Sequence, residues 1–142
     1  MIQRIQTLWL VLASACSFLT LRLSFYSGNK LVNGQQGFVH LTAANADNLI
    51  LLVLTVAAAL GSLISIFLFT NRSLQRNIVI ATLAVCILNI VLFFMETRKF
   101  MLNQGNYDLT AVFAFLPPIF LILALRGIYK DQKLIKSLDR LR

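Results

Sequence analysis

Residues 49–69 read LILLVLTVAAALGSLISIFLF, and residues 78–95 read IVIATLAVCILNIVLFFM. Neither run contains a charged residue, and the short polar stretch 71–77 joins them. A helix needs about 20 largely apolar residues to cross the hydrocarbon core of a bilayer, which is about 30 Å thick. The two runs therefore predict an antiparallel pair of transmembrane helices.

Two further apolar runs flank this pair, at residues 5–25 and 109–125. The chain is 58% hydrophobic and only 13% charged, whereas soluble domains carry about 25% charged residues. Run 109–125 is short and ends at Arg126, whose side chain can extend to the membrane surface. The sequence predicts one all-α domain over residues 1–142, a four-helix transmembrane bundle with spans at about 5–25, 49–69, 78–95 and 109–125 and a tail over 126–142.

A cleaved signal peptide is the competing interpretation of the first run. Residues 13–16 read ASAC, which loosely resembles a lipoprotein cleavage site ending in Cys16. The apolar run continues past Cys16 to Phe25, which is long enough to span a bilayer. We therefore expect the first run to be retained as a span.

The basic residues are unevenly distributed between the two sides of the predicted spans. The side with both termini and the 71–77 connection carries nine of the thirteen: Arg4, Arg72, Arg76, Arg126, Lys130, Lys133, Lys136, Arg140 and Arg142. The other side carries Arg22, Lys30, Arg98 and Lys99. The positive-inside rule then predicts a multi-pass protein of a bacterial inner membrane with both termini in the cytoplasm. The net charge of +8 predicts contact with anionic membrane lipids, not with nucleic acid.

The segments outside the spans have their own patterns. In loop 26–46, apolar stretches flank Asn33–Gly34, which predicts a β-hairpin in a small outer cap. In loop 96–107, the apolar residues 100–102 are expected to pack on that hairpin or to lie at the membrane interface. Tail 126–142 is amphipathic at helical spacing, which predicts a cytoplasmic helix that continues the last span or lies on anionic lipid. A short coiled-coil seam is a further alternative.

Few side chains within or beside the spans are polar. Arg22 and Glu96 lie at the outer ends of the first and third runs, which suggests a structural ion pair. Asn89 in the third run is expected to hydrogen-bond to a neighbouring helix, and Gly61 and Ser65 form part of a small-residue stripe that permits close helix packing.

Helix ends and bends are also predicted. Asp47 with Asn48, and Asp108, precede the second and fourth runs as candidate N-caps. Pro117 and Pro118 predict a kink in the fourth run near residues 113 and 114.

Residues that carry enzymatic chemistry do not form a recognisable constellation. His40 is the only histidine, Cys16 and Cys86 lie far apart inside apolar runs, and no Cys-x-x-Cys or glycine-rich phosphate loop occurs. We therefore expect no enzymatic activity, no cofactor and no metal site.

The two ends of the chain resemble a known family. The opening MIQRIQT, followed by Trp9, and the ending KDQKLIKSLDRLR resemble small four-span membrane proteins of Bacteroidota, catalogued as a domain of unknown function. The resemblance implies an inner-membrane location and supplies no catalytic residue.

Both end motifs fall on the predicted cytoplasmic side, which suggests one composite docking surface. Its expected members are Gln3, Arg4, Gln6, Asp131, Lys133, Asp139 and Arg140. The favoured function is a non-enzymatic accessory or scaffold subunit of a membrane assembly, with a membrane-protein partner or a second copy of the chain. The alternative is a small self-associating transporter or channel.

Overall fold

The computed structural model describes the backbone of residues 2–32, 35–100 and 105–139, and the side chains of residues 5–30, 37–100 and 105–134. Within these residues the chain is mostly helical. Its elements are α1 (Ile2–Leu19), β1 (Tyr26–Val32), β2 (Gln35–Leu41), α2 (Leu49–Phe67), the 3-10 turn η1 (Leu68–Thr70), α3 (Arg72–Thr97), β3 (Gly105–Tyr107), the 3-10 turn η2 (Leu109–Ala111) and α4 (Val112–Asp139).

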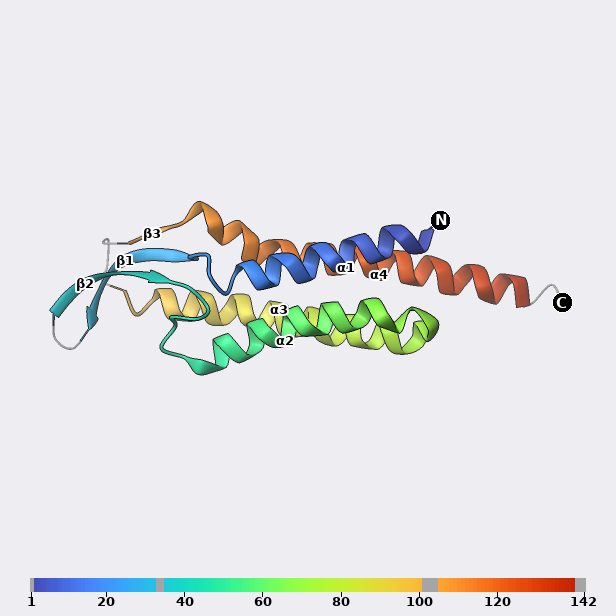
Figure 1. The fold of residues 1–142 in the computed structure, drawn as a ribbon, viewed down its shortest axis with the longest axis horizontal. Helices are drawn as coiled ribbons and strands as arrows, with labels where there is room; N and C mark the ends of the chain where they lie inside the picture. The colour runs from blue at the N-terminus through green and yellow to red at the C-terminus, as the bar shows by residue number, and fades with distance from the viewer. Residues whose placement is uncertain (1, 33–34, 101–104, 140–142) are drawn as a thin grey trace.

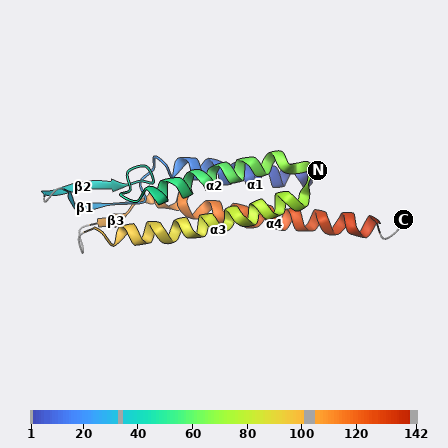
Figure 2. The ribbon, with the colours of Figure 1, turned by 90° about the horizontal axis from the view of Figure 1, so that it is seen from below.

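The four helices lie side by side along the long axis of the molecule (Figure 1). Helix α1 packs against α2 and α4, and α3 packs against the same two neighbours. The start of α1, the α2–α3 connection and the end of α4 lie at one end, and the strands lie at the other, as the perpendicular view in Figure 2 also shows. We call these the basic end, which carries Arg72, Arg76 and Lys130, and the sheet end.

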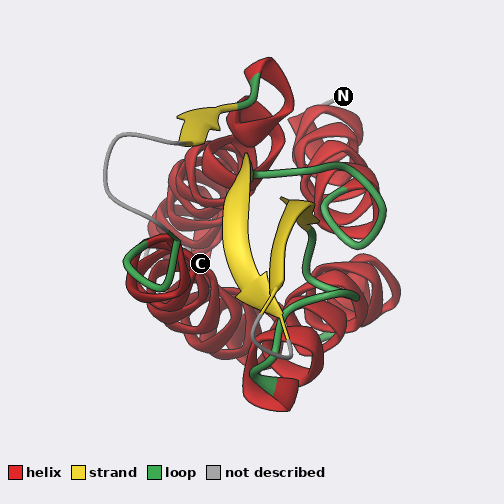
Figure 3. Ribbon diagram, turned by 90° about the vertical axis from the view of Figure 1, so that its left-hand side faces the viewer, coloured by secondary structure: helices red, strands yellow, loops and turns green. Residues whose placement is uncertain are grey.

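A three-stranded antiparallel sheet covers part of the sheet end (Figure 3). Its order is β2–β1–β3, with Tyr26 opposite Leu41 in one pair and opposite Tyr107 in the other. The predicted hairpin is confirmed in the described part, while its turn, Asn33–Gly34, lies outside the described residues. The third strand was not predicted and extends the expected hairpin, while the described chain is mostly helical with four helices, as expected.

Helix α1 ends earlier than the first apolar run. The helix stops at Leu19 rather than at Phe25, and the following residues form a turn that leads into β1 at Tyr26. The Phe25 amide donates to the Leu41 carbonyl at 2.7 Å, and the Phe25 carbonyl accepts from the Asp108 amide at 3.2 Å. Three segments are long and apolar enough to cross a membrane, namely Leu49–Thr70, Arg72–Thr97 and Leu109–Leu134. The described apolar part of α1, Ile5–Leu19, is shorter.

Asparagine side chains begin two of the helices. The Asn48 side chain accepts from the Ile50 amide at 3.1 Å and caps α2. The Asn71 side chain accepts from the Leu74 amide at 3.3 Å and caps α3. The polar stretch 71–77 is therefore mostly the first two turns of α3 rather than a loop. Asp108 lies at the N-cap position of η2, as predicted, but its side chain makes no cap hydrogen bond.

Helix α4 is continuous from Val112 to Asp139, with Pro117 and Pro118 inside it. The described part of the predicted tail therefore continues the fourth apolar run as one helix. In Figure 1 this helix extends past the other helices at the basic end.

Two buried clusters hold these elements together. One joins the helices around Leu10, Val79 and Leu121, and there the Trp9 ring stacks on Phe120 with centroids 5.8 Å apart. The other joins the sheet to the helices around Phe25, which stacks on Phe93 at 4.7 Å.

Candidate functional site

A buried polar cluster links three helices at the basic end. Asp131 on α4 is only 6% exposed. One of its carboxylate oxygens accepts a hydrogen bond from Gln6 Nε2 on α1 at 2.8 Å and lies 3.2 Å from a guanidinium nitrogen of Arg72 on α3. A buried carboxylate is stable only when it is paired and hydrogen-bonded. We call these three residues the Asp131 cluster.

The close packing around this cluster depends on a glycine. A side-chain carbon added at Gly127 would lie 2.6 Å from Gln6 Cγ, so only glycine lets α1 and α4 approach this closely here. On the same side of the molecule, Arg76 donates to Gln132 Oε1 at 3.2 Å, and its guanidinium lies 5.8 Å from the centre of the Tyr129 ring.

The docking surface expected from the sequence is wrong in part. Gln6 and Asp131 are buried and bound to each other, so they join helices instead of facing a partner. Lys133 is exposed. The side chains of Gln3, Arg4 and Asp139, and the whole of Arg140, lie outside the described residues. The sequence offered no sign of the Gln6–Asp131 contact, because the two residues are 125 positions apart.

A second polar group lies inside the packed helices. Asn89 on α3 donates from Nδ2 to Thr55 Oγ1 on α2 at 2.8 Å. This contact is a hydrogen bond to a neighbouring helix, of the kind expected for Asn89. The Asn89 Oδ1 atom is buried and has no hydrogen-bond partner.

The small-residue stripe lies on the same pair of helices. A side-chain carbon at Gly61 would lie 2.6 Å from Thr82 Oγ1, so the close approach of α2 to α3 requires glycine at this position. The Ser65 hydroxyl donates to the Gly61 carbonyl at 2.8 Å, and the Ser65 carbonyl accepts from Gln75 Nε2 at 3.0 Å.

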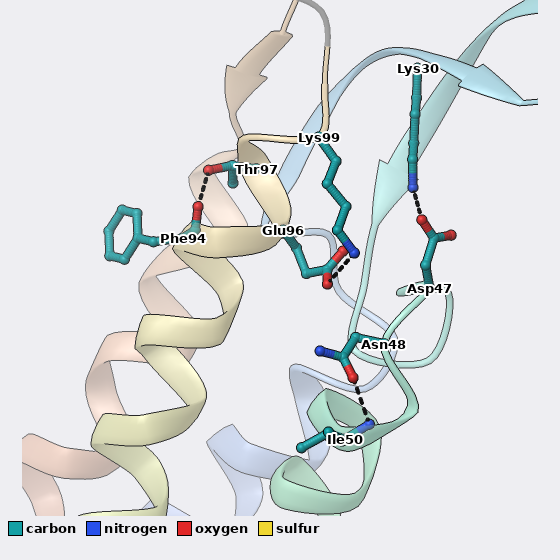
Figure 4. A network of polar contacts seen from close by, with 8 residues as sticks. All are labelled: Lys30, Asp47, Asn48, Ile50, Phe94, Glu96, Thr97 and Lys99. Carbon is teal, nitrogen blue, oxygen red and sulfur yellow. Dashed lines mark hydrogen bonds and ion pairs between the residues drawn. The ribbon is translucent and has the colours of Figure 1, made fainter.

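Glu96 has a different partner from the one expected. It is 3% exposed, and its carboxylate lies 2.7 Å from Lys99 Nζ, one helical turn away (Figure 4). Arg22 is exposed and takes part in none of the ion pairs found among the described residues. The predicted Arg22–Glu96 pair is therefore not formed, because Lys99 lies close enough on the same segment to neutralise the buried carboxylate.

Asp47 pairs with Lys30, which joins β1 to the loop before α2 (Figure 4). The hydrogen bond from Lys30 lowers the pKa of Asp47, and the charges of Lys30 and Lys99 act in the same direction. Stability from this contact is present above the ordinary carboxyl pKa and is lost as the pH falls through the lowered value. Because the Asp47 side chain is 58% exposed, solvent keeps this contribution small.

A serine, a histidine and an aspartate meet at the sheet end. The hydroxyls of Ser24 and Ser27 both donate to one carboxylate oxygen of Asp108, and Ser27 Oγ lies 2.7 Å from His40 Nδ1. The Ser27 hydroxyl therefore lies between Asp108 and His40. This order differs from that of a hydrolytic triad, in which histidine lies between serine and the acid. The group therefore joins β1, β2 and the start of α4.

Other chemistry-bearing residues are dispersed. In the described part of the chain, no group of three or more His, Cys, Asp or Glu side chains could hold a metal ion. Cys16 and Cys86 are buried free thiols.

The chain was compared with protein families, curated proteins and solved structures. No curated protein matches it, and no solved structure does. The model of one family, described as a domain of unknown function (DUF4293), matches residues 2–141. A match over nearly the whole sequence shows that the chain belongs to this family of proteins with a domain of unknown function.

Proposed function

We propose that the protein is an integral membrane protein whose four helices form a transmembrane bundle, and that it acts as a non-enzymatic accessory or scaffold subunit of an inner-membrane assembly. Both termini are assigned to the cytoplasmic side. The single observation that carries the membrane assignment is the distribution of polar and apolar side chains across the helices.

That distribution differs from that of soluble proteins at the outer surface of the helices. Large apolar side chains are exposed on the outer faces, including Ile50, Val53, Leu60 and Ile64 on α2, Ile80, Ile87, Leu88 and Val91 on α3, and Ile119 and Ile122 on α4. Polar side chains are buried between the helices, including Ser14, Thr55, Ser62, Ser65, Thr82 and Asn89. A continuous apolar exterior of this extent marks contact with lipid or with another protein.

The helices differ in how well their lengths match a bilayer. At 1.5 Å per residue, the 18 residues of α1 span about 27 Å, but its apolar part Ile5–Leu19 spans only about 22 Å, less than the hydrocarbon thickness of about 30 Å. The 28 residues of α4 span about 42 Å, so its last turns reach beyond the hydrocarbon region. The exposed Arg126, Lys130 and Lys133 lie on this last part of α4. Basic side chains at this depth favour the anionic cytoplasmic leaflet, which supports cytoplasmic termini.

Labelling of introduced cysteines in spheroplasts tests the topology. Ala44→Cys is exposed at the sheet end, and Ser73→Cys is exposed at the basic end. A membrane-impermeant maleimide should label Ala44→Cys in intact spheroplasts and Ser73→Cys only after lysis. The native thiols Cys16 and Cys86 are buried and serve as the unlabelled control. Labelling of both new cysteines before lysis would contradict the proposed topology.

The scaffold role is supported by how the polar side chains are used. The Asp131 cluster and the Asn89–Thr55 bond connect helices to one another, so these residues maintain the packing rather than line a transport route. With Gln6 and Asp131 buried, the docking surface is reassigned to the exposed side of the protruding α4, which carries Lys130 and Lys133.

Purification at natural expression level, followed by native mass spectrometry in lipid nanodiscs, tests this role. A stoichiometric second protein is the expected result, and Lys130→Gln with Lys133→Gln should reduce its recovery. Arg22→Gln with Arg98→Gln at the sheet end also removes two exposed charges and should leave recovery unchanged. A homo-oligomer without any second protein would instead favour the self-associating transporter or channel.

A further inference from the structure

A small cavity lies between the four helices, on the sheet-end half of the molecule. Side chains from α2, α3, α4 and the end of α1 line it, and its polar lining consists of Ser17, Thr20, Thr55, Asn89 and the thiol of Cys86. The space open to the centre of a water molecule is about 10 Å³, which corresponds to roughly one water.

Every hydroxyl that lines the cavity already has an acceptor for its proton. Ser17, Thr20 and Thr55 each donate to a backbone carbonyl one turn earlier in the chain, at 2.9, 2.7 and 2.7 Å. Asn89 Nδ2 donates to Thr55 Oγ1, while Asn89 Oδ1 is buried without a donor. The lining thus has an unused acceptor, and besides the Cys86 thiol, which is only a weak donor, it has no spare proton to satisfy that acceptor.

A second acceptor follows from the proline pair in α4. In a helix, the carbonyl of residue 114 would accept from the amide of residue 118, or from that of residue 117 in a tighter 3-10 turn. Both residues are proline and have no amide proton. The Ala114 carbonyl therefore has no such helical donor, and Ala114 and Pro117 both line the cavity.

We propose that this cavity is a binding site for one ordered water molecule, which donates one proton to Asn89 Oδ1 and the other to the Ala114 carbonyl. The ligand has to be a small donor, because both free groups are acceptors. A neutral ligand is favoured over a cation, since the lining has no carboxylate to compensate a buried positive charge. The water would replace the helical hydrogen bond lost at the prolines and would link α3 to α4. This inference does not depend on the proposed scaffold role.

Water-edited solid-state NMR of the isotope-labelled protein in liposomes tests the proposal. Magnetisation from water should reach Asn89 Nδ2 as rapidly as it reaches the exposed Asn71 side chain. The backbone amide of the fully buried Leu121 supplies the slow reference. Transfer to Asn89 as slow as transfer to Leu121 would overturn the proposal.

Two variants distinguish a water that bridges α3 and α4 from a water bound to Asn89 alone. Asn89→Leu keeps a similar volume but removes the acceptor, so water transfer to the Ala114 carbonyl should be lost. Pro118→Ala restores an amide donor for that carbonyl, so water transfer to Asn89 should fall. Unchanged transfer in both variants would contradict a shared water. The midpoint of thermal unfolding in NaCl or KCl, compared with choline chloride, tests for a cation. A higher midpoint with Na⁺ or K⁺ in the native protein, but not in Asn89→Leu, would assign the site to a cation and refute the water.

Discussion

Loss of the Gln6–Asp131 hydrogen bond should separate α1 from α4 at the basic end. Gln6→Met removes the donor but keeps a side chain of similar size against Gly127. The lost bond is made to a carboxylate that is only 6% exposed, and a hydrogen bond to a charged group contributes about 1.5–3 kcal/mol. We therefore expect Gln6→Met to reduce the free energy of unfolding by about 2 kcal/mol.

Asp131→Ala should have a larger effect. It removes the partner of Arg72 as well as the acceptor for Gln6. Breaking a buried ion pair from one side costs about 3–5 kcal/mol, but the Arg72 side chain is 26% exposed and can be rehydrated. A loss of about 3 kcal/mol is expected after this discount. In Gln6→Met/Asp131→Ala the two effects should overlap, because the same hydrogen bond is removed by each change.

Equilibrium unfolding in mixed micelles with increasing SDS measures these differences. Trp9, the only tryptophan, stacks on Phe120 across the α1–α4 contact and reports their separation by fluorescence. Lys133→Ala, two residues from Asp131 and exposed, is the matched control and should change stability by less than about 0.5 kcal/mol. If the effects of Gln6→Met and Asp131→Ala add to within about 0.5 kcal/mol, the proposed coupling is refuted.

Two further predictions concern the other end of the molecule and the α2–α3 contact. Gly61→Ala should destabilise the protein by about 1–3 kcal/mol through overpacking against Thr82, and Gly61→Ala/Thr82→Ala should recover most of the loss, measured by the same unfolding assay. A fully stable single variant would show that α2 and α3 are not in close contact. Lys99→Met should leave the carboxylate of Glu96 buried without its cation and lower the thermal unfolding midpoint, whereas Arg22→Met should not. Equal shifts in these two variants would contradict the assignment of Lys99 as the partner.

The agreement between the elements predicted from the sequence and those in the structure differed between parts of the chain. The second and third runs correspond to the two helices α2 and α3, because an uncharged apolar stretch of this length has few other stable structures. Helix boundaries were less accurate. Local hydropathy does not show that residues 20–25 leave the helix, since apolar Leu21, Leu23 and Phe25 alternate with polar residues in a pattern that fits a span end as well as a turn. The path of the chain here depends on Phe25, whose backbone bonds to Leu41 and Asp108 from distant parts of the chain.

The partners of the buried polar side chains are set by proximity in the folded chain and could not be identified from the sequence pattern. Arg22 and Glu96 were matched by charge and by predicted depth, yet Lys99 is already held one turn from Glu96 by the end of α3. Gln6 and Asp131 were assigned to the surface because they are polar and lie near the ends of the chain. Packing of α1 on α4 at Gly127 buries both, and each then satisfies the other.

The sequence alone determined the helical character of the chain, the hairpin and the concentration of basic residues at one end, because apolar length, turn residues and charge are local properties. Only the tertiary structure decided where α1 stops, that a third strand joins the hairpin, and which buried polar atoms are paired. These features depend on contacts between residues far apart in the chain. Whether two polar side chains form a hydrogen bond or an ion pair depends on where helix packing places them. The unpaired Asn89 Oδ1, in a cavity that Pro117 also lines, belongs to this second class.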